Sequence, residues 1–366
     1  MTRSIDPVAD QPDEARVREA LRAVVDPDLR KDIVSLGFVK DVRIEDGRVA
    51  ATIELTTPAC PVRDELRGQA ERAIRALPGV TAADVRMTAV VPSAPSVTSL
   101  IPGVRNVVAI ASGKGGVGKS TLSANIAAAL ALAGARVGLM DADVYGPSIP
   151  AMMGARETPA DLGDRLQPVV RHGVKIISMG FFLKEGQAVV WRGPMLHKMV
   201  QEFLGDVDWH ELDYLLVDLP PGTGDIQLSL CQTIPLTGAL VVSTPQDVAV
   251  DVARKAIAMF DKLNVPVLGL VENMSAYVCP HCGEHDDIFG AGGARRAAER
   301  LQLPYLGAVP LASAVRERSD EGTPIVIADP TAPAALAFTR VAELLAAQVS
   351  VRRLALAGTA PIAVTF

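Results

Sequence analysis

One glycine- and lysine-rich stretch decides the fold of this chain. It reads Ala111-Ser112-Gly113-Lys114-Gly115-Gly116-Val117-Gly118-Lys119-Ser120-Thr121. Gly113 and Gly118 bracket four residues before Lys119 and Ser120, which gives the pattern G-x-x-x-x-G-K-S. Glycines let backbone N–H groups converge on one point, and a helix that follows directs its positive end to the same place. The stretch therefore predicts a loop that binds the phosphates of a nucleotide.

The side chains of this loop have separate expected roles. Lys119 would neutralise the outer phosphates, and the Ser120 hydroxyl would coordinate Mg²⁺. The Thr121 hydroxyl would contact the α-phosphate, although threonine at a helix start is also common as a cap. The cradle around the phosphates would be formed by Gly113, Lys114, Gly115, Gly116, Val117 and Gly118. These residues together form the predicted nucleotide and Mg²⁺ site.

The flanks of the loop agree with this interpretation. Residues 105–111 are a short apolar run typical of a strand, and residues 122–132 are an alanine- and leucine-rich run typical of a helix. Lys114 is one lysine more than the pattern requires, and it lies at the opposite end of the loop from Lys119. Taken alone, Lys114 is equally well explained as a solvated surface lysine.

Composition limits the kinds of function to be considered. The 366 residues are enough for two domains, and 49% apolar with 21% charged residues is ordinary for a globular protein. A net charge of -6 gives no basic footprint for nucleic acid, so nucleic acid is not an expected partner. The first residues lack a signal pattern, and the uncharged stretch 120–135 is interrupted by polar residues and Gly134. We expect a cytoplasmic protein with no membrane partner.

The chain is expected to contain two folded units. Residues 1–90 predict a small α+β domain, 91–104 a proline- and serine-containing linker, 105–350 a second domain, and 351–366 a flexible tail. In the first domain we expect helices over 13–25 and 62–77 and strands over 37–44, 48–55 and 83–90. In the second domain further strands are expected over 136–141, 174–179, 214–218, 238–243, 266–272 and 305–309. Most of these runs are nearly continuous valine, isoleucine and leucine, so the second domain should be an α/β fold with a doubly wound, mostly parallel sheet.

Acidic residues follow two of these expected strands. Because the carboxyl ends of parallel strands meet at one edge of the sheet, Asp218 and Asp143 should face the same ligand as the loop. Asp218 would hold Mg²⁺, and Asp143 would orient an attacking water. Gly222, just after Asp218, would offer its N–H to the terminal phosphate. A helix cap or turn is the alternative role of each aspartate taken alone.

The cysteines indicate metal or redox chemistry. Four cysteines are too few for a disulfide scaffold, and Cys279 and Cys282 form the one close pair. A two-residue spacer lets both thiolates reach one zinc ion or iron–sulfur cluster, but supplies only two of four ligands. An identical pair across a two-fold axis would complete the set. The alternatives are a zinc site completed by His281 or His285 and a thioredoxin-like redox pair.

The loop with its additional Lys114 resembles the deviant Walker A loop of the MinD/ParA/nitrogenase-iron-protein class of ATPases. In that class the extra lysine reaches the nucleotide of the partner subunit, so the resemblance implies an ATP-dependent homodimer in which Lys114, Lys119 and Asp143 are catalytic. Asn273 matches an asparagine that contacts the adenine ring in this class, and a turn or cap role is the alternative.

Further segments are similar to the Mrp/ApbC family of iron–sulfur cluster carriers. They span about residues 100–345 and comprise 140–148, 191–195, 218–225 and 272–283. Residues 26–29, 33–37 and 55–61 are similar to the small domain of iron–sulfur assembly factors, in which the cysteine corresponding to Cys60 is a functional candidate. Packing as a small buried hydrophobe is the alternative role of Cys60, and Cys231 is expected to be a buried helix residue.

The resemblance implies a slow ATPase that carries a [4Fe-4S] cluster bridged between two subunits by Cys279 and Cys282. Its implied partners are apo iron–sulfur client proteins and assembly scaffolds. Two other functions stay open: a spatial organiser of the MinD/ParA kind and a zinc-stabilised P-loop ATPase regulator. The organiser would need a C-terminal amphipathic helix or a basic surface, and the tail after residue 350 is interrupted by Gly358 and Pro361.

Overall fold

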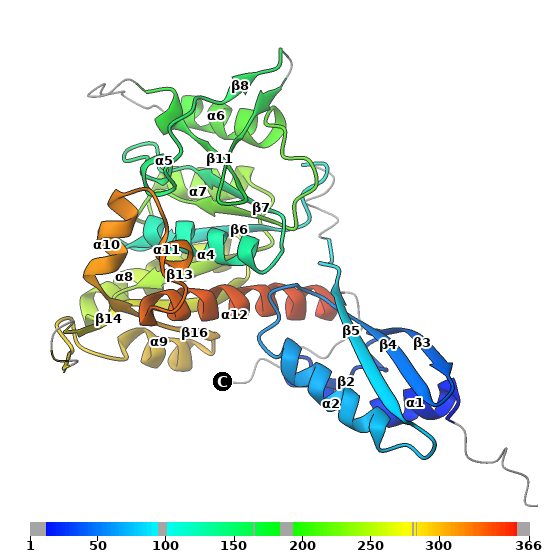
Figure 1. The fold of residues 1–366 in the computed structure, drawn as a ribbon. Coiled ribbons are helices and arrows are strands. Elements are labelled where there is room, and N and C mark those ends of the chain that lie inside the picture. Colours follow the sequence, from blue (N-terminus) through cyan, green and yellow to red (C-terminus); the bar gives the residue numbers. More distant parts are fainter. Residues whose placement is uncertain are drawn as a thin grey trace, which may run out of the picture. The chain divides into compact units, whose positions relative to one another are not determined.

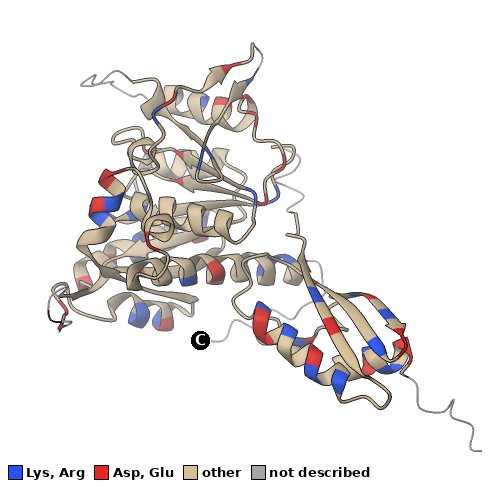
Figure 2. Cartoon of the chain, viewed as in Figure 1, with Lys and Arg blue, Asp and Glu red and all other residues tan. Residues whose placement is uncertain are grey.

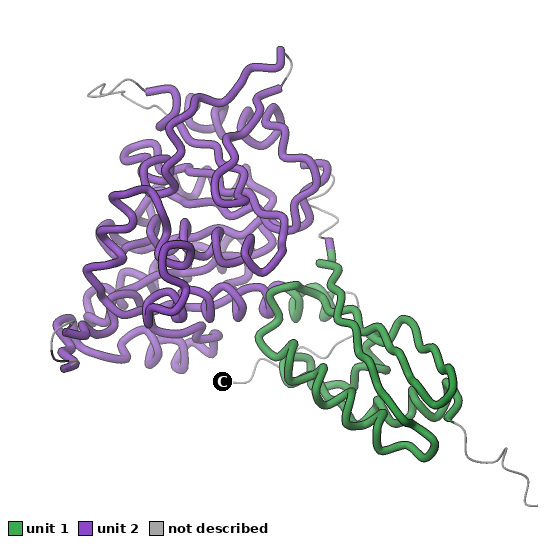
Figure 3. The backbone as a smooth tube through the Cα atoms, viewed as in Figure 1, with its two compact units in different colours: residues 1–92, 350–362 green, residues 93–349, 363–366 purple. Residues whose placement is uncertain are grey.

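The computed structural model describes residues 12–93, 101–163, 165–183, 193–279, 282 and 284–356. The chain divides into two compact units (Figure 3). The small unit contains residues 1–92 and 350–362, and the large unit contains residues 93–349 and 363–366. Part of the expected linker, residues 94–100, lies outside the described residues.

The large unit is built on one sheet of nine strands (Figure 1). Its strands are β6 (Val107–Ser112), β7 (Val137–Asp141), β10 (Val169–Arg171), β11 (Val174–Ser178), β12 (Tyr214–Asp218), β13 (Gly238–Ser243), β14 (Val267–Val278), β15 (His285–Asp286) and β16 (Tyr305–Leu311). The order is β10-β11-β7-β12-β6-β13-β14-β15, and β16 also pairs with β14. Only β10 and β15 pair antiparallel; the other neighbours are parallel. The predicted α/β fold with a mostly parallel sheet is confirmed.

Helices cover both faces of this sheet. They are α4 (Lys119–Leu132), α5 (Ile149–Met152), α6 (Gly193–Gly205), α7 (Asp225–Thr233), α8 (Asp247–Lys262), α9 (Gly293–Leu301), α10 (Ser313–Asp320), α11 (Ile325–Ala328) and α12 (Pro333–Leu356). Val107, Ala109 and Ala111 of β6 share a core with side chains of α6, α7, α8 and α9. Helix α4 packs on β6, β7 and β12 without joining that core, so it covers the opposite face. Smaller elements are β8 (Ala160–Asp161), β9 (Leu166–Gln167) and the 3₁₀ turn η1 (Met179–Phe181).

The small unit combines helices with a three-stranded sheet. Its elements are α1 (Glu14–Leu21), β1 (Val25–Asp26), β2 (Lys31–Asp32), β3 (Val39–Glu45), β4 (Arg48–Leu55), α2 (Arg63–Arg75) and β5 (Ala82–Ala89). Strand β4 pairs antiparallel with β3 and parallel with β5, because α2 provides the crossover between β4 and β5. Figure 2 shows charges of both signs interspersed along α2, and Leu66, Ala70 and Ile74 of that helix face the core. The expected α+β unit is therefore present.

The end of the chain differs from the sequence-based expectation. We expected a flexible tail from residue 351, but α12 continues to Leu356. Val351 and Leu354 lie one turn apart and pack against the core of the small unit. This apolar spacing explains why the helix continues beyond residue 350. Residues 357–366 lie outside the described residues.

Helix α12 is long and apolar enough to cross a membrane by length and composition alone. In this protein 56% of its most apolar window is buried inside the fold. Phe338, Val341 and Leu345 are among its buried side chains. The apolar character of α12 is thus explained by core packing.

Candidate nucleotide and metal-binding sites

The glycine-rich loop lies between the end of β6 and the start of α4, as its sequence predicts. Gly116 and Gly118 have φ values of +78° and +79°, which side chains rarely adopt. A Cβ atom on Gly113 would lie 2.5 Å from the backbone carbonyl carbon of Val252 on α8. The loop therefore needs glycine for its turns and for the close approach of α8.

Lys119 and Asp218 form the buried centre of the site. The Lys119 Nζ donates to Asp218 Oδ2 at 2.7 Å, and only 6% and 0% of the two side chains are exposed. The hydroxyl of Ser120 donates to the same carboxylate oxygen at 2.6 Å, and that of Ser123 donates to Asp218 Oδ1 at 2.6 Å. Both oxygens of Asp218 are thus oriented by α4. Ser120 and Asp218 present hard oxygen atoms side by side, which is the donor set that Mg²⁺ prefers.

Two further carboxylates lie at the end of β7, where Asp141 is the last residue of the strand and Asp143 follows it. Asp143 Oδ2 lies 3.8 Å from Lys119 Nζ, and burial raises the pKa of this carboxyl, with Lys119 opposing the shift. Asp141 is buried, accepts from the Ser178 hydroxyl at 2.9 Å and from the Ile149 N–H at 3.3 Å. Burial, and next the charge of Asp218, raise the pKa of Asp141. Carboxylates therefore outnumber lysines near the Lys119 ammonium.

The loop after β12 contacts the phosphate loop directly. Gly222 has a φ of +103°, and its N–H donates to the carbonyl of Ser112 at 3.0 Å. Lys114 and Pro221 line the same pocket as Lys119 and Ser120. Among the described residues, the Lys114 side chain makes no hydrogen bond or ion pair, while its carbonyl accepts from the Ser112 hydroxyl at 2.9 Å. The structure thus leaves the extra lysine at the rim of the phosphate pocket.

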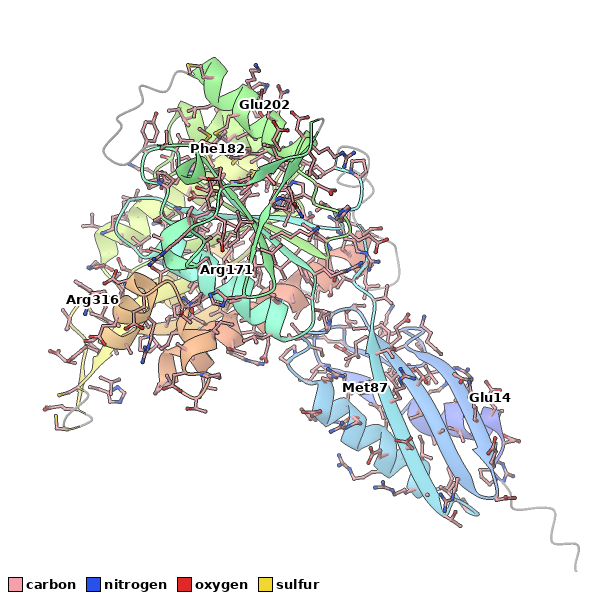
Figure 4. All side chains as sticks on the ribbon, turned by 45° about the horizontal axis from the view of Figure 1, so that its top comes forward. Glu14, Met87, Arg171, Phe182, Glu202 and Arg316 are labelled. Atoms are coloured by element: carbon pink, nitrogen blue, oxygen red, sulfur yellow. The ribbon has the colours of Figure 1, made fainter. Side chains whose placement is uncertain are left out.

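A second cavity of about 200 Å³ adjoins the phosphate pocket, because Gly118, Thr121 and Met152 line both. Its other walls are Asn273, Met274, Pro310, Leu311, Ala312, Val315, Arg316, Ser319, Asp320 and Phe338. Asn273 Nδ2 donates to the carbonyl of Val117 at 2.8 Å, which holds this amide against the phosphate loop. Arg316 on α10, labelled in Figure 4, donates to Asp320 at 2.8 Å. A mainly apolar cavity with polar groups next to a phosphate site has the character of a base pocket.

Cys279 and Cys282 lie between β14 and β15, which pair as an antiparallel hairpin. The Cys279 N–H donates to the carbonyl of Glu284 at 2.9 Å, which closes the hairpin. Cys279 is partly exposed and Cys282 is exposed. Within the part of the chain that is described, no three His, Cys, Asp or Glu side chains gather to hold a metal. His281, one expected alternative zinc ligand, lies outside the described residues, and His285 is exposed on β15.

The two isolated cysteines have different surroundings. Cys60 packs against the core of the small unit just before α2, and it is partly buried. Cys231 is buried in α7, as expected, and burial raises its thiol pKa to about 12. A thiol with so high a pKa is a poor nucleophile and metal ligand at neutral pH.

The family model described as NUBPL iron-transfer P-loop NTPase matches residues 103–346. The chain belongs to this NTPase family. A second model, described as an iron–sulfur cluster assembly protein, matches residues 14–85 in the small unit. The two matches confirm the resemblances expected for the two units.

Relatives match nearly the whole length of the chain. The chain is 50% identical to an iron–sulfur cluster carrier protein of Deinococcus radiodurans, over 92% of this chain and 95% of the relative. It is 46% identical to one of Synechocystis, over 92% of this chain and 98% of the relative. Among solved structures, a nucleotide-binding protein of Archaeoglobus fulgidus in complex with ADP is 40% identical. That likeness has a TM-score of 0.56 and covers 62% of this chain and 90% of the other.

Sequence reasoning missed three polar residues of the NTPase site. Ser123 lies four residues after Lys119 on α4, and this helical spacing was a signal that both reach Asp218. Ser178 ends β11 in register with Asp141, the last residue of β7. Asp141 lies in the segment 140–148 that resembles the family, and its burial between two strand ends was the feature that the sequence did not reveal. The expected motif residues Trp191 and Arg192 lie outside the described residues.

Proposed function

We propose that this chain is an ATP-hydrolysing carrier that holds a [4Fe-4S] cluster between two copies of itself and transfers it to apo-proteins. The main support for ATP binding is the buried contact of Lys119 and Ser120 with Asp218. The relatives named iron–sulfur cluster carrier protein support the choice of cargo.

The phosphate chemistry follows from the charges in the site. Without nucleotide, Lys119 is neutralised by Asp218, so a phosphate that accepts from Lys119 releases part of that carboxylate for Mg²⁺. Ser120 and Asp218 would hold the ion, directly or through its waters, and the bound ion would neutralise charge on the β- and γ-phosphates. Asp143, which lies beside Lys119 and is mostly buried, would orient the attacking water. The adjoining cavity with Asn273 takes the adenine.

Two features favour a homodimer. Lys114 stands at the pocket rim with no side-chain partner among the described residues, so its ammonium is available to the nucleotide of a second copy. The hairpin offers the pair Cys279 and Cys282, and a cluster normally takes four thiolates. One two-fold axis satisfies both requirements. ATP binding and hydrolysis would then alter the dimer geometry around the cluster.

The proposed function also implies partner proteins and a location in the cell. The partners are apo iron–sulfur client proteins and assembly scaffolds, and the small unit, matched by an assembly-protein model, is a candidate contact for them. The net charge of -6 favours neither nucleic acid nor an anionic membrane as a partner. We propose a cytoplasmic location, where thiols stay reduced.

The test is anaerobic reconstitution with iron and sulfide, followed by absorption spectroscopy and transfer to an apo-acceptor. Wild type should gain about one cluster per dimer, and Cys279→Ala and Cys282→Ala should each lose both the cluster and the transfer. Cys231→Ala is the matched control, because that thiol is buried in α7, and it should behave as wild type. A Cys279→Ala/Cys282→Ala double variant that still binds and transfers a cluster would refute the bridging site.

A further inference from the structure

Four buried polar atoms of the described residues lack a hydrogen-bond partner, and they belong to residues that follow the strands on either side of β6. Among the described residues they are Nε2 and Oε1 of Gln227, Oγ1 of Thr244 and Oε1 of Gln246. Gln227 follows β12, while Thr244 and Gln246 follow β13. These two strands are the neighbours of β6 in the sheet, one on each side. Because buried polar groups in folded proteins are nearly always hydrogen-bonded, their position beside the nucleotide loop calls for an explanation.

Gln227 is the most exceptional of the three. Its side chain is buried, with 2% exposed, and both the donor and the acceptor of its amide lack a partner among the described residues. Leu230 and Cys231, three and four residues further along α7, belong to the core under the sheet. Helical spacing therefore directs Gln227 inward, on the same face of α7. An amide held there without partners raises the free energy of this state.

The chain next to Gln227 is the loop that contacts the phosphate loop. At one end, the Gly222 N–H donates to Ser112 at 3.0 Å. At the other end, the Gly224 carbonyl accepts from the N–H of Leu228 at 3.1 Å, in the first turn of α7. The N–H of Gly222 must leave Ser112 if it is to reach a terminal phosphate. That movement shifts the backbone groups between Gly222 and Gly224, which directly precede the turn carrying Gln227.

We propose that Gln227 is a positioning residue that makes the site distinguish ATP from ADP. Its amide gains backbone partners from residues 220–224 when that loop closes on the terminal phosphate, and it lacks them otherwise. The gained bonds add to the affinity for ATP and not to that for ADP, since only the closed state contains them. The inference rests on the proposed nucleotide function, and it assigns to Gln227 no contact with the nucleotide.

The test replaces Gln227 by methionine, an apolar side chain of similar length. Binding of ADP and of a non-hydrolysable ATP analogue, both with Mg²⁺, is measured by calorimetry. We expect an unchanged Kd for ADP and a Kd for the analogue that is about three- to tenfold higher, as loss of one or two hydrogen bonds implies. The Tm without nucleotide should stay the same or rise, because the unpartnered amide is gone. Gln201→Met, on the exposed surface of α6, is the matched control and should change neither Kd.

A purely structural role would change both nucleotide affinities equally. An unchanged ratio of the two Kd values in Gln227→Met therefore overturns the proposal. Wild type that binds neither nucleotide would overturn the proposed function instead, so the two failures are distinguishable. If Gln227→Met does not fold, hydrogen exchange of wild type decides: amides of residues 220–228 should be protected more by the analogue than by ADP, and equal protection refutes the inference.

Discussion

A single side chain, Lys119, places one positive charge beside three carboxylates at the phosphate pocket. Asp218 is its nearest partner, Asp143 lies 3.8 Å away, and Asp141 is buried beside them. Taking these carboxylates out of water is costly unless cations or protons compensate them. Burial and the Asp218 charge raise the pKa of Asp141, which is one form of that compensation. The residues thus form a site whose excess negative charge suits a divalent cation.

The Lys119→Ala variant tests this charge balance. Removing the ammonium leaves Asp218 buried and unpaired, so we expect a loss of stability of about 3 kcal/mol and no detectable nucleotide binding. Urea denaturation measures the first quantity, and a fluorescent nucleotide titration measures the second. Lys198→Ala is the control, and it should keep wild-type stability and binding because Lys198 lies on the surface of α6 in an exposed ion pair with Glu202. Normal ATP hydrolysis by Lys119→Ala would disprove the loop assignment.

Motif spacing made some site residues predictable and left others hidden. Lys119, Ser120 and Asp218 were predicted because a phosphate loop and an aspartate-terminated strand have fixed positions in a parallel sheet. Ser178 belongs to the site only because β11 pairs with β7 in a register that places it beside Asp141. No local pattern encodes that register.

Among the elements, buried strands were the most predictable. The six strands expected after the loop occur as β7, β11, β12, β13, β14 and β16. Each contains a run of mainly apolar side chains, and every residue of β7, β12 and β13 is buried. The short strands β8, β9, β10 and β15 were not predicted, since pairing with neighbours rather than composition defines them. β14 also extends beyond its expected end to Val278, and this extension carries the cysteine hairpin.

The last turns of α12 give a prediction at the scale of the element. Val351→Asp places a charge against the core of the small unit, so we expect that unit to lose about 2 kcal/mol of stability. Both tryptophans, Trp191 and Trp209, lie in the large unit, so their fluorescence reports its unfolding alone. The transition followed by circular dichroism should shift to lower temperature while the fluorescence transition stays.

Leu356→Asp provides the matched control for that experiment. Leu356 ends the same helix and is 66% exposed, so its replacement should leave both transitions unchanged. Equal effects of the two substitutions would show that residues 351–356 contribute nothing specific to the small unit.

At the scale of the whole molecule, two features of the large unit need groups that a single chain does not supply. Lys114 has no side-chain partner among the described residues, and the hairpin with Cys279 and Cys282 offers two thiolates where a cluster takes four. The two features are far apart in the large unit's sequence and involve unrelated chemistry. A second copy related by a two-fold axis would complete both.

This symmetry predicts a dimer that depends on ATP and on Lys114. Asp143→Ala should slow hydrolysis and so let the ATP-bound dimer accumulate, which light scattering after size-exclusion chromatography detects as a doubled mass. Adding Lys114→Ala to that variant should return the mass to the monomer, because the partner's nucleotide then loses its ammonium contact, while the nucleotide affinity of each monomer stays the same. The conservative Lys114→Arg should restore part of the dimer, since the charge is kept but its geometry is changed. The opposite outcome is that Lys114→Ala/Asp143→Ala dimerises with ATP as fully as Asp143→Ala. Lys114 would then have no role in the interface, and the cysteine pair would be the sole argument for two-fold symmetry.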